Sequence, residues 1–366
     1  MSSITIAGRQ IGPGQPCYVV AELSGNHHRR FERAVELVRA AKACGADAVK
    51  LQTYTPDTIT IDCDTPHFTI GAGTLWEGRT LHDLYGEAYT PWEWHPPLKE
   101  LAESLGMHCF SSPFDASAVD FLEGLRVPAY KIASFELVDL PLIRRVARTG
   151  KPIIMSTGMA TLAEIDEAVR TARATGAREL ALLACSSAYP APPEAINLRR
   201  IPDLAARFDV VTGLSDHTLG IAVPIASVAV GACVIEKHFC LSRDDPGPDS
   251  AFSLEPPEFE ALVQAVRTVE RAVGRPEYGV DAAEQASRVF RRSLFVVRDV
   301  KAGERFTTDS VRSIRPGNGL HTRHLESVIG REAARDIPRG TPLSWDLVRM
   351  EAPADPSKAE KSRGGR

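Results

Sequence analysis

The stretch CYVVAELSGNHHRRFERAVELVRAAKACGADAVKLQTY (17–54) decides the fold. An apolar, β-branched run opens it at 17–23, and a second such run closes it at 48–54. Between them, at 31–45, apolar residues recur three and four positions apart and the pattern ends at a glycine, as in an amphipathic helix. The stretch therefore predicts a strand, a helix and a second strand in succession.

The same alternation continues along the chain. Eight strands are predicted, at 17–23, 48–54, 108–113, 129–134, 152–158, 180–186, 210–216 and 233–239. Strands that alternate with helices favour a parallel sheet. Closed on itself, such a sheet forms a (β/α)₈ TIM barrel of the usual size, about 250 residues. An open doubly wound sheet is the alternative, but no G-x-G-x-x-G follows the first strand, which weakens a dinucleotide-binding interpretation.

The character of the sequence changes after the eighth strand. We predict the barrel over 1–280, a linker over 281–288, a small domain of short strands over 289–350 and a disordered tail over 351–366. Within the barrel, the connection that contains TLWEGRTLHDLYGEAYTPWEWH (74–95) is unusually long and rich in aromatic residues. Such a connection is either a lid or specificity element, or a packed excursion that covers the barrel end.

The amino-acid composition limits the classes of function to consider. The 366 residues are 43% hydrophobic and carry a formal net charge of −4, which gives no reason to expect nucleic acid or an anionic membrane as a partner. Seven cysteines without a C-x-x-C pair indicate reduced thiols in a cytoplasmic protein. The sequence has neither a signal-type start nor an apolar run of about 20 residues, the length of a membrane helix.

Polar residues stand at almost every predicted strand end. TIM-barrel active sites form at the carboxyl ends of the strands. Buried polar groups cost roughly 1–3 kcal/mol each when unpaired, so a ring of them indicates a site rather than a stabilising feature. The set includes Glu22, Lys50, Gln52, Ser112, Lys131, Ser134, Glu136, Ser187, Tyr189, Ser215, His217 and His238.

Two histidines end adjacent strands. His217 and His238 follow the seventh and eighth strands, where two imidazoles can share one divalent cation. Imidazole with water and oxygen ligands suits Mn²⁺, Mg²⁺ or Co²⁺. The alternative is that one of the pair is a hydrogen-bonded core histidine.

Lysine and serine residues stand at the ends of the middle predicted strands. Lys50 and Lys131, with serines on neighbouring strands, suit a phosphate or carboxylate. A Schiff-base aldolase using Lys50, Lys131 or Lys237 is the competing chemistry, and it needs no histidine pair. Glu22 is a candidate acid/base or sugar contact. Asp249, in the loop DDPGPDS, is either a ligand contact or an ordinary turn aspartate.

At these residues a resemblance becomes specific. The motifs AELSGNH, AVKLQTY, SSPFD, YKIASFE, CSSAYP, GLSDHT, EKHF and DDPGPD resemble, in this order, the sialic acid synthase family. RPGNGL (315–320) is similar to the small antifreeze-like, β-clip SAF domain of that family. The resemblance covers nearly the whole chain except the tail. AELSGNH and the segment 74–95 are most similar to the pseudaminic acid branch.

The resemblance implies a reaction. Phosphoenolpyruvate would condense with the open-chain aldehyde of 2,4-diacetamido-2,4,6-trideoxy-L-altrose, giving a nine-carbon 2-keto acid and phosphate by C–O cleavage. A divalent metal would assist. Synthesis of N-acetylneuraminate or legionaminic acid is the alternative within the family. A Schiff-base aldolase and a non-enzymatic carbohydrate-binding protein are the alternatives of other classes.

The resemblance also implies roles for individual residues. Glu22 and Glu136 match acid/base candidates, and His217 and His238 match the metal ligands. Phosphoenolpyruvate contacts would be Lys50, Ser112, Lys131, Ser134, Ser187 and Ser215; sugar contacts would be Glu22, Gln52, Tyr189, Asp249 and, from the partner of a domain-swapped homodimer, Arg315. Three positions depart from the neuraminate pattern: Ser112 for threonine, Ser187 for asparagine and Phe135 for glycine. They fit a less polar sugar.

Overall fold

The computed structural model describes residues 2–350, which divide between Gly274 and Arg275 into two compact units. The predicted disordered tail, 351–366, lies outside the described residues. Within 2–350, no helix combines the length and apolar character that crossing a membrane requires.

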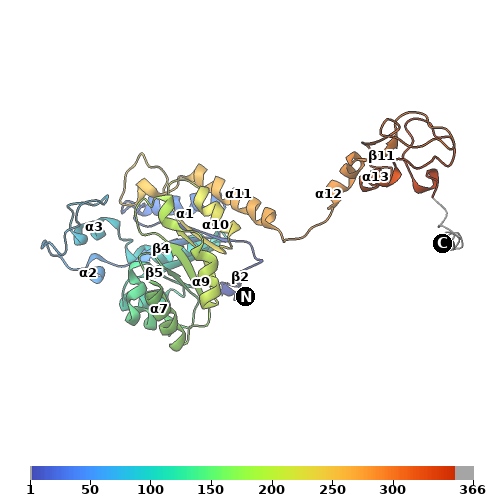
Figure 1. Ribbon diagram of the computed structural model, residues 1–366. Coiled ribbons are helices and arrows are strands. Elements are labelled where there is room, and N and C mark those ends of the chain that lie inside the picture. The colour runs from blue at the N-terminus through green and yellow to red at the C-terminus, as the bar shows by residue number, and fades with distance from the viewer. Residues whose placement is uncertain (1, 351–366) are drawn as a thin grey trace. The chain divides into compact units, whose positions relative to one another are not determined.

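Eight parallel strands close into a barrel in the first unit (Figure 1). They are β3 (Tyr18–Glu22), β4 (Ala48–Thr53), β5 (His108–Pro113), β6 (Tyr130–Ile132), β7 (Ile153–Ser156), β8 (Leu180–Cys185), β9 (Val211–Asp216) and β10 (Val234–His238). The last strand pairs with the first, so that His238 lies in register with Glu22. This closure confirms the predicted barrel and excludes the open doubly wound sheet.

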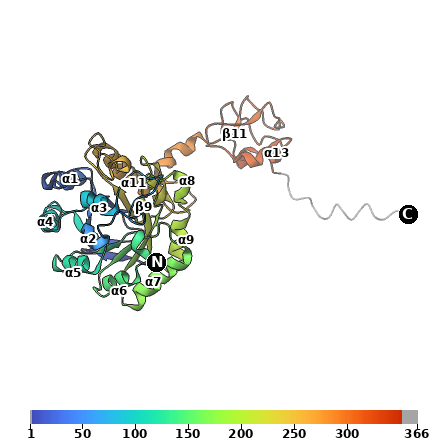
Figure 2. The same cartoon turned by 90° about the vertical axis from the view of Figure 1, so that its left-hand side faces the viewer.

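Helices surround the strands (Figure 2). The longer ones are α1 (Phe31–Ala43), α3 (Leu81–Ala88), α4 (His95–Ser104), α5 (Ala116–Gly124), α6 (Leu140–Ala147), α7 (Leu162–Ala174), α9 (Arg200–Phe208), α10 (Ala222–Ala229) and α11 (Pro256–Val273). Local sequence explains their starts: Thr161 and Glu164 form the expected capping box at the start of α7. Each main helix buries an apolar stripe, such as Leu37 and Val38 of α1, against the barrel.

The barrel interior is layered from apolar to polar. Because alternate residues of a strand face opposite sides, Tyr18, Val20 and Glu22 all point inward from β3. Tyr18 and Val20 belong to an apolar cluster at the amino-terminal end. An N-terminal hairpin of β1 (Ile4–Ile6) and β2 (Arg9–Ile11), which we did not predict, inserts its isoleucines into the same cluster. The apolar layers leave the carboxyl ends of the strands to polar side chains.

The second unit is a small β structure with its own core. Strands β11 (Ser293–Val296) and β12 (Val311–Ile314) pair antiparallel, and residues such as Leu294 and Phe306 are buried with them. The segment 281–288, predicted as a linker, carries α12 (Ala282–Gln285) and the start of a 3-10 helix (Ala286–Phe290).

Candidate active site

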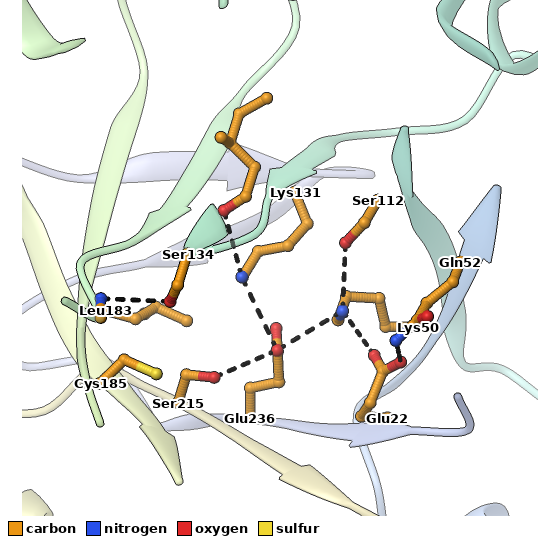
Figure 3. A network of polar contacts seen from close by, with 12 residues as sticks. Glu22, Lys50, Gln52, Ser112, Lys131, Ser134, Leu183, Cys185, Ser215 and Glu236 are labelled. Carbon is orange, nitrogen blue, oxygen red and sulfur yellow. Dashed lines mark hydrogen bonds and ion pairs between the residues drawn. The ribbon is translucent and has the colours of Figure 1, made fainter. Parts of the chain in front are cut away.

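Four charged side chains meet inside the barrel near the carboxyl ends of the strands (Figure 3). Lys50 Nζ lies 2.6 Å from Glu22 Oε2 and 3.5 Å from Glu236 Oε1. Lys131 Nζ lies 3.7 Å from the same Glu236 oxygen. All four residues are buried. We call Glu22, Lys50, Lys131 and Glu236 the charged cluster.

Burial and mutual contact shift these groups in different directions. Burial alone would raise the pKa of Glu236, but Lys131 and Lys50 outweigh it and hold that pKa below its usual value. Burial raises the pKa of Glu22 despite its contact with Lys50. Burial also lowers the pKa of Lys131, whereas Glu22 and Glu236 overcome burial and raise that of Lys50. The pKa values of the two carboxyls in the cluster are therefore shifted in opposite directions.

Two serines extend the charged cluster. Lys50 Nζ donates to Ser112 Oγ at 3.1 Å, and Ser215 Oγ donates to Glu236 Oε1 at 3.3 Å. The structure thus brings both predicted hydroxyls within hydrogen-bonding distance of the cluster.

The loop after β7 brings two further hydroxyls together. Gly158 N donates to Ser134 Oγ at 3.1 Å. A Cβ at Gly158 would lie 2.2 Å from Ser187 Oγ and 2.7 Å from Ser134 Oγ. Only glycine allows the backbone to approach both hydroxyls this closely.

The two imidazoles lie side by side. The ring centroids of His217 and His238 are 5.3 Å apart. His217 Nδ1 contacts the Ser186 carbonyl oxygen at 2.8 Å, which fixes the ring and directs Nε2 away from that carbonyl. His238 Nδ1 is buried without a hydrogen-bond partner, and burial holds the pKa of this imidazole well below its usual value. A neutral imidazole with an unpaired nitrogen is suited to bind a cation.

Within the described part of the chain, no third side chain joins the histidine pair in a metal-binding group. Among residues 2–350, no group of three or more His, Cys, Asp or Glu side chains is arranged to hold a metal ion. Cys185 Sγ contacts His217 Nδ1 at 3.8 Å. A cation on the two imidazoles would take its other ligands from water or substrate, as in sites with open positions.

Buried polar atoms without partners gather at this end of the barrel. They include Glu136 Oε2, Ser156 Oγ, Ser187 Oγ and His238 Nδ1. Each such atom costs roughly 1–3 kcal/mol in a folded protein, so a group of them needs a compensating role. Burial also raises the pKa of Glu136 to about 7. These atoms offer hydrogen bonds to a polar ligand.

Comparison with known proteins identifies the family. The sequence model of the NeuB family matches residues 37–278, which is more than half of the chain. The chain belongs to the NeuB family. The SAF domain model matches residues 291–349 of this NeuB-family chain, so the predicted fold of both parts is confirmed.

Curated relatives extend over nearly the whole chain. Pseudaminic acid synthase of Helicobacter pylori is 44% identical over 335 residues, covering 91% of this chain and 98% of that protein. N,N'-diacetyllegionaminic acid synthase of Legionella pneumophila is 36% identical over 342 residues, covering 92% and 96%. The relatives are named synthases, and the prediction of an enzyme is confirmed.

A solved structure agrees with this family assignment. The N-acetylneuraminic acid synthetase of Leptospira borgpetersenii is 28% identical and superimposes with a TM-score of 0.70. The match covers 78% of this NeuB-family chain and 95% of the Leptospira chain.

The predicted sugar contacts of the barrel lie at the rim of the site. Gln52 Nε2 donates to Glu22 Oε1 at 3.0 Å. Asp249 is held by the hydroxyl of Ser24, and burial raises its pKa. The ring of Tyr189 packs on His217 with centroids 4.4 Å apart.

The long excursion reaches this rim. Trp76 Nε1 donates to the Pro248 carbonyl oxygen at 2.9 Å, and its ring lies 5.7 Å from that of Tyr189. Tyr85 of α3 packs against Tyr54, which follows β4, with ring centroids 5.6 Å apart. The excursion is therefore packed structure that also contacts a predicted sugar-binding residue.

Lys237, Asp216 and Arg315 lie outside the charged cluster and the histidine pair. Lys237 faces outward from β10 and pairs with Asp216, which is accordingly turned away from the histidine pair. Of the three aldolase candidates, only Lys50 and Lys131 therefore face the site. Arg315 is exposed just after β12 in the second unit. Its contact with a barrel stays a prediction.

Sequence reasoning assigned no role to two residues that the structure places in the site. Glu236 joins the two lysines, and Cys185 lies beside His217. The period-two alternation of strands contains the signal: Glu236 is two residues from inward-facing His238, and Cys185 is two residues from Leu183.

Proposed function

We propose that the protein condenses phosphoenolpyruvate with 2,4-diacetamido-2,4,6-trideoxy-L-altrose to give pseudaminic acid and inorganic phosphate. The observation that carries the proposal is the 44% identity with pseudaminic acid synthases across about nine tenths of the chain. Identity with the legionaminic acid synthases is 34–36%. A nonulosonic acid synthase function is the coarser conclusion that all these relatives support.

The charged cluster and its hydroxyls supply the anion site in this proposal. Lys50 and Lys131 provide ammonium groups, and Ser187 provides an unpaired buried hydroxyl, which together suit a phosphate. Ser112 and Ser134 add hydroxyls within reach of the same region. Glu22 and Glu236 balance the lysine charges before the anion binds.

Glu136 is the acid/base candidate that the geometry supports best. In the reaction, C3 of phosphoenolpyruvate bonds to the aldehyde carbon and the aldehyde oxygen gains a proton. Water adds to C2 and loses a proton. The bond between C2 and the phosphate oxygen then breaks, and the new C2 hydroxyl becomes the keto group as its proton passes to the departing phosphate. A carboxyl whose pKa is about 7 can give and take protons at neutral pH. Its unpaired Oε2 is free to contact the reacting oxygen.

The histidine pair fits a divalent cation. His217 and His238 would hold it, and Mn²⁺ suits two imidazoles with oxygen ligands best, with Mg²⁺ or Co²⁺ as alternatives. When bound, such a cation polarises a carbonyl oxygen as a Lewis acid. The observation that supports the fit is the unpaired, buried Nδ1 of His238.

Apolar side chains at the mouth of the barrel support a deoxy sugar. Phe135 follows β6 and Met159 follows β7, and they are 58% and 61% exposed. Large apolar groups exposed beside a polar site suit a ligand with methyl groups. The proposed sugar carries a 6-deoxy methyl and two acetamido methyls.

The decisive experiment measures phosphate release with phosphoenolpyruvate, Mn²⁺ and each of the pseudaminic, legionaminic and neuraminic precursor sugars. We expect release with the diacetamido altrose and none without sugar. Release with none of the three sugars would refute the synthase. His217→Ala is expected to abolish turnover, and the same variant tests the cation site by Mn²⁺ titration.

A lysine-trapping experiment tests the competing aldolase. Burial lowers the pKa of Lys131, so of the two inward lysines it is the one suited to act as a Schiff-base amine. Borohydride with pyruvate is expected to leave the protein unlabelled. Covalent labelling of Lys131, with a reaction insensitive to EDTA, would favour the aldolase.

A mixing experiment tests the proposed domain-swapped homodimer, in which Arg315 of one chain completes the site of the other. Arg315→Ala and His217→Ala proteins are each expected to be inactive. Unfolded together and refolded, they form heterodimers with one intact site, so about a quarter of wild-type activity should return. No recovery would indicate that each chain completes its own site.

We place this activity in the cytoplasm, in line with seven free cysteines.

A further inference from the structure

A buried ion pair lies on the outer face of the barrel, directly behind the two imidazoles. Lys237 Nζ lies 2.6 Å from Asp216 Oδ2, and neither side chain is exposed. The two residues are register partners on the adjacent strands β10 and β9. Their neighbours Ile235 and Phe239 pack with the surrounding helices, so Lys237 faces away from the barrel axis while His238 faces inward.

Further contacts join this pair to Thr218. Asp216 accepts hydrogen bonds from Thr218 N at 3.1 Å and from Thr218 Oγ1 at 3.0 Å. Lys237 Nζ also donates to the Thr218 carbonyl oxygen. Asp216 and Thr218, which stand on either side of His217, are therefore both bonded to Lys237, the residue that precedes His238. We call Asp216, Lys237 and Thr218 the clamp.

Stability alone does not explain the clamp. Burying two charges is often no better than burying apolar side chains of similar volume, and sometimes worse. The contacts of the clamp instead end on the backbone segments that carry the imidazoles. Groups behind the ligands of a metal orient them, and their loss typically weakens metal affinity by about 10–100-fold.

We propose that the clamp sets the separation and orientation of His217 and His238, which makes Asp216, Lys237 and Thr218 positioning residues of the cation site. The inference rests on the proposed function in one respect, that the two imidazoles hold a divalent cation. The ring geometry that the clamp imposes does not depend on that assumption.

The test uses the double variant Asp216→Asn/Lys237→Met in the full-length protein. Removing both charges together leaves no unpaired charge buried. The matched control is Asp47→Asn. Asp47 pairs with Arg9 and with Arg267 and accepts a backbone hydrogen bond at the amino-terminal end of the barrel, far along the strands from the imidazoles.

The first measurement is Mn²⁺ binding to the metal-free protein by calorimetric titration, without substrates. We expect the double variant to bind Mn²⁺ about tenfold or more weakly than wild type, with the control within about twofold. Thr218→Val keeps the ion pair and should weaken binding less than the double variant. Equal affinity of the double variant and the control would overturn the proposal.

The second measurement separates the clamp from the cation. Crystal structures of the metal-free wild type and double variant give the separation of the imidazole centroids, which is 5.3 Å in the described structure. We expect the rings to move apart or rotate in the double variant, and unchanged rings would overturn the proposal whether or not Mn²⁺ binds. If wild type and His217→Ala bind Mn²⁺ equally, the metal part of the proposed function fails instead.

Discussion

Replacing Glu236 by glutamine removes one of two negative charges from the charged cluster. Two ammonium groups would then face the single carboxylate of Glu22 in a buried site. Breaking a buried ion pair costs about 3–5 kcal/mol. The amide can keep the hydrogen bond with Ser215, so we expect the lower end, about 3 kcal/mol. For a domain of this size that is a fall in Tm of roughly 6–12 °C.

The assay is differential scanning calorimetry of the metal-free protein, with Glu123→Gln as the matched control. Glu123 contacts Lys151 near the surface, where removing the charge should cost about 1 kcal/mol or less. Inorganic phosphate provides a second readout. Because it can compensate the excess positive charge, it should raise the Tm of Glu236→Gln more than that of wild type.

Two results would refute this reasoning. If Glu236→Gln and Glu123→Gln lower the Tm equally, the charges of the cluster are not coupled as their distances indicate. If phosphate stabilises wild type and Glu236→Gln equally, the lysines of the cluster are not the anion site.

Three further predictions each concern a single residue. Gly158→Ala places a Cβ against Ser187 and should raise KM for phosphoenolpyruvate by about tenfold, measured by steady-state phosphate release; unchanged KM would exclude Ser187 from that site. Glu136, with a folded pKa of about 7 against 4.5 for the ordinary carboxyl, keeps its proton where the unfolded chain releases it, so stability should fall as pH rises through this window. Unfolding of wild type and Glu136→Gln from pH 4 to 8 should therefore diverge by about 3 kcal/mol, and parallel curves would contradict the shift. Trp76→Ala removes the contact with Tyr189 and should raise KM for the sugar while leaving KM for phosphoenolpyruvate near wild type; the reverse pattern would remove the excursion from the sugar site.

The barrel was predictable because its signal is local and repeated. Each strand is a short apolar run and each main helix has an apolar stripe, so the element order follows from periodicity alone. The N-terminal hairpin was not predictable. Its turn places Ala7 at φ 47° and Gly8 at φ 83°, and alanine rarely adopts positive φ, so the usual hairpin signature is missing.

The gathering of polar side chains at the strand ends was predictable, but the contacts among them were not. Position at a strand end does not distinguish Lys50 from Lys237. Because side chains alternate along a strand, Lys50 faces the barrel interior and Lys237 faces outward. The meeting of Glu236 with lysines from two other strands depends on barrel closure across the axis, and no local pattern encodes it.

The surroundings of three carboxyls in the candidate site shift their pKa values differently. Lys131 and Lys50 hold the pKa of Glu236 low, so this group stays ionised as the counter-ion of the lysines. Burial raises the pKa of Glu22, and an incoming anion at the same lysines would raise it further. Burial raises the pKa of Glu136 to about 7. Because acid and base roles follow from pKa values that are pushed apart, we expect Glu136 rather than Glu236 to be the carboxyl that exchanges protons at neutral pH.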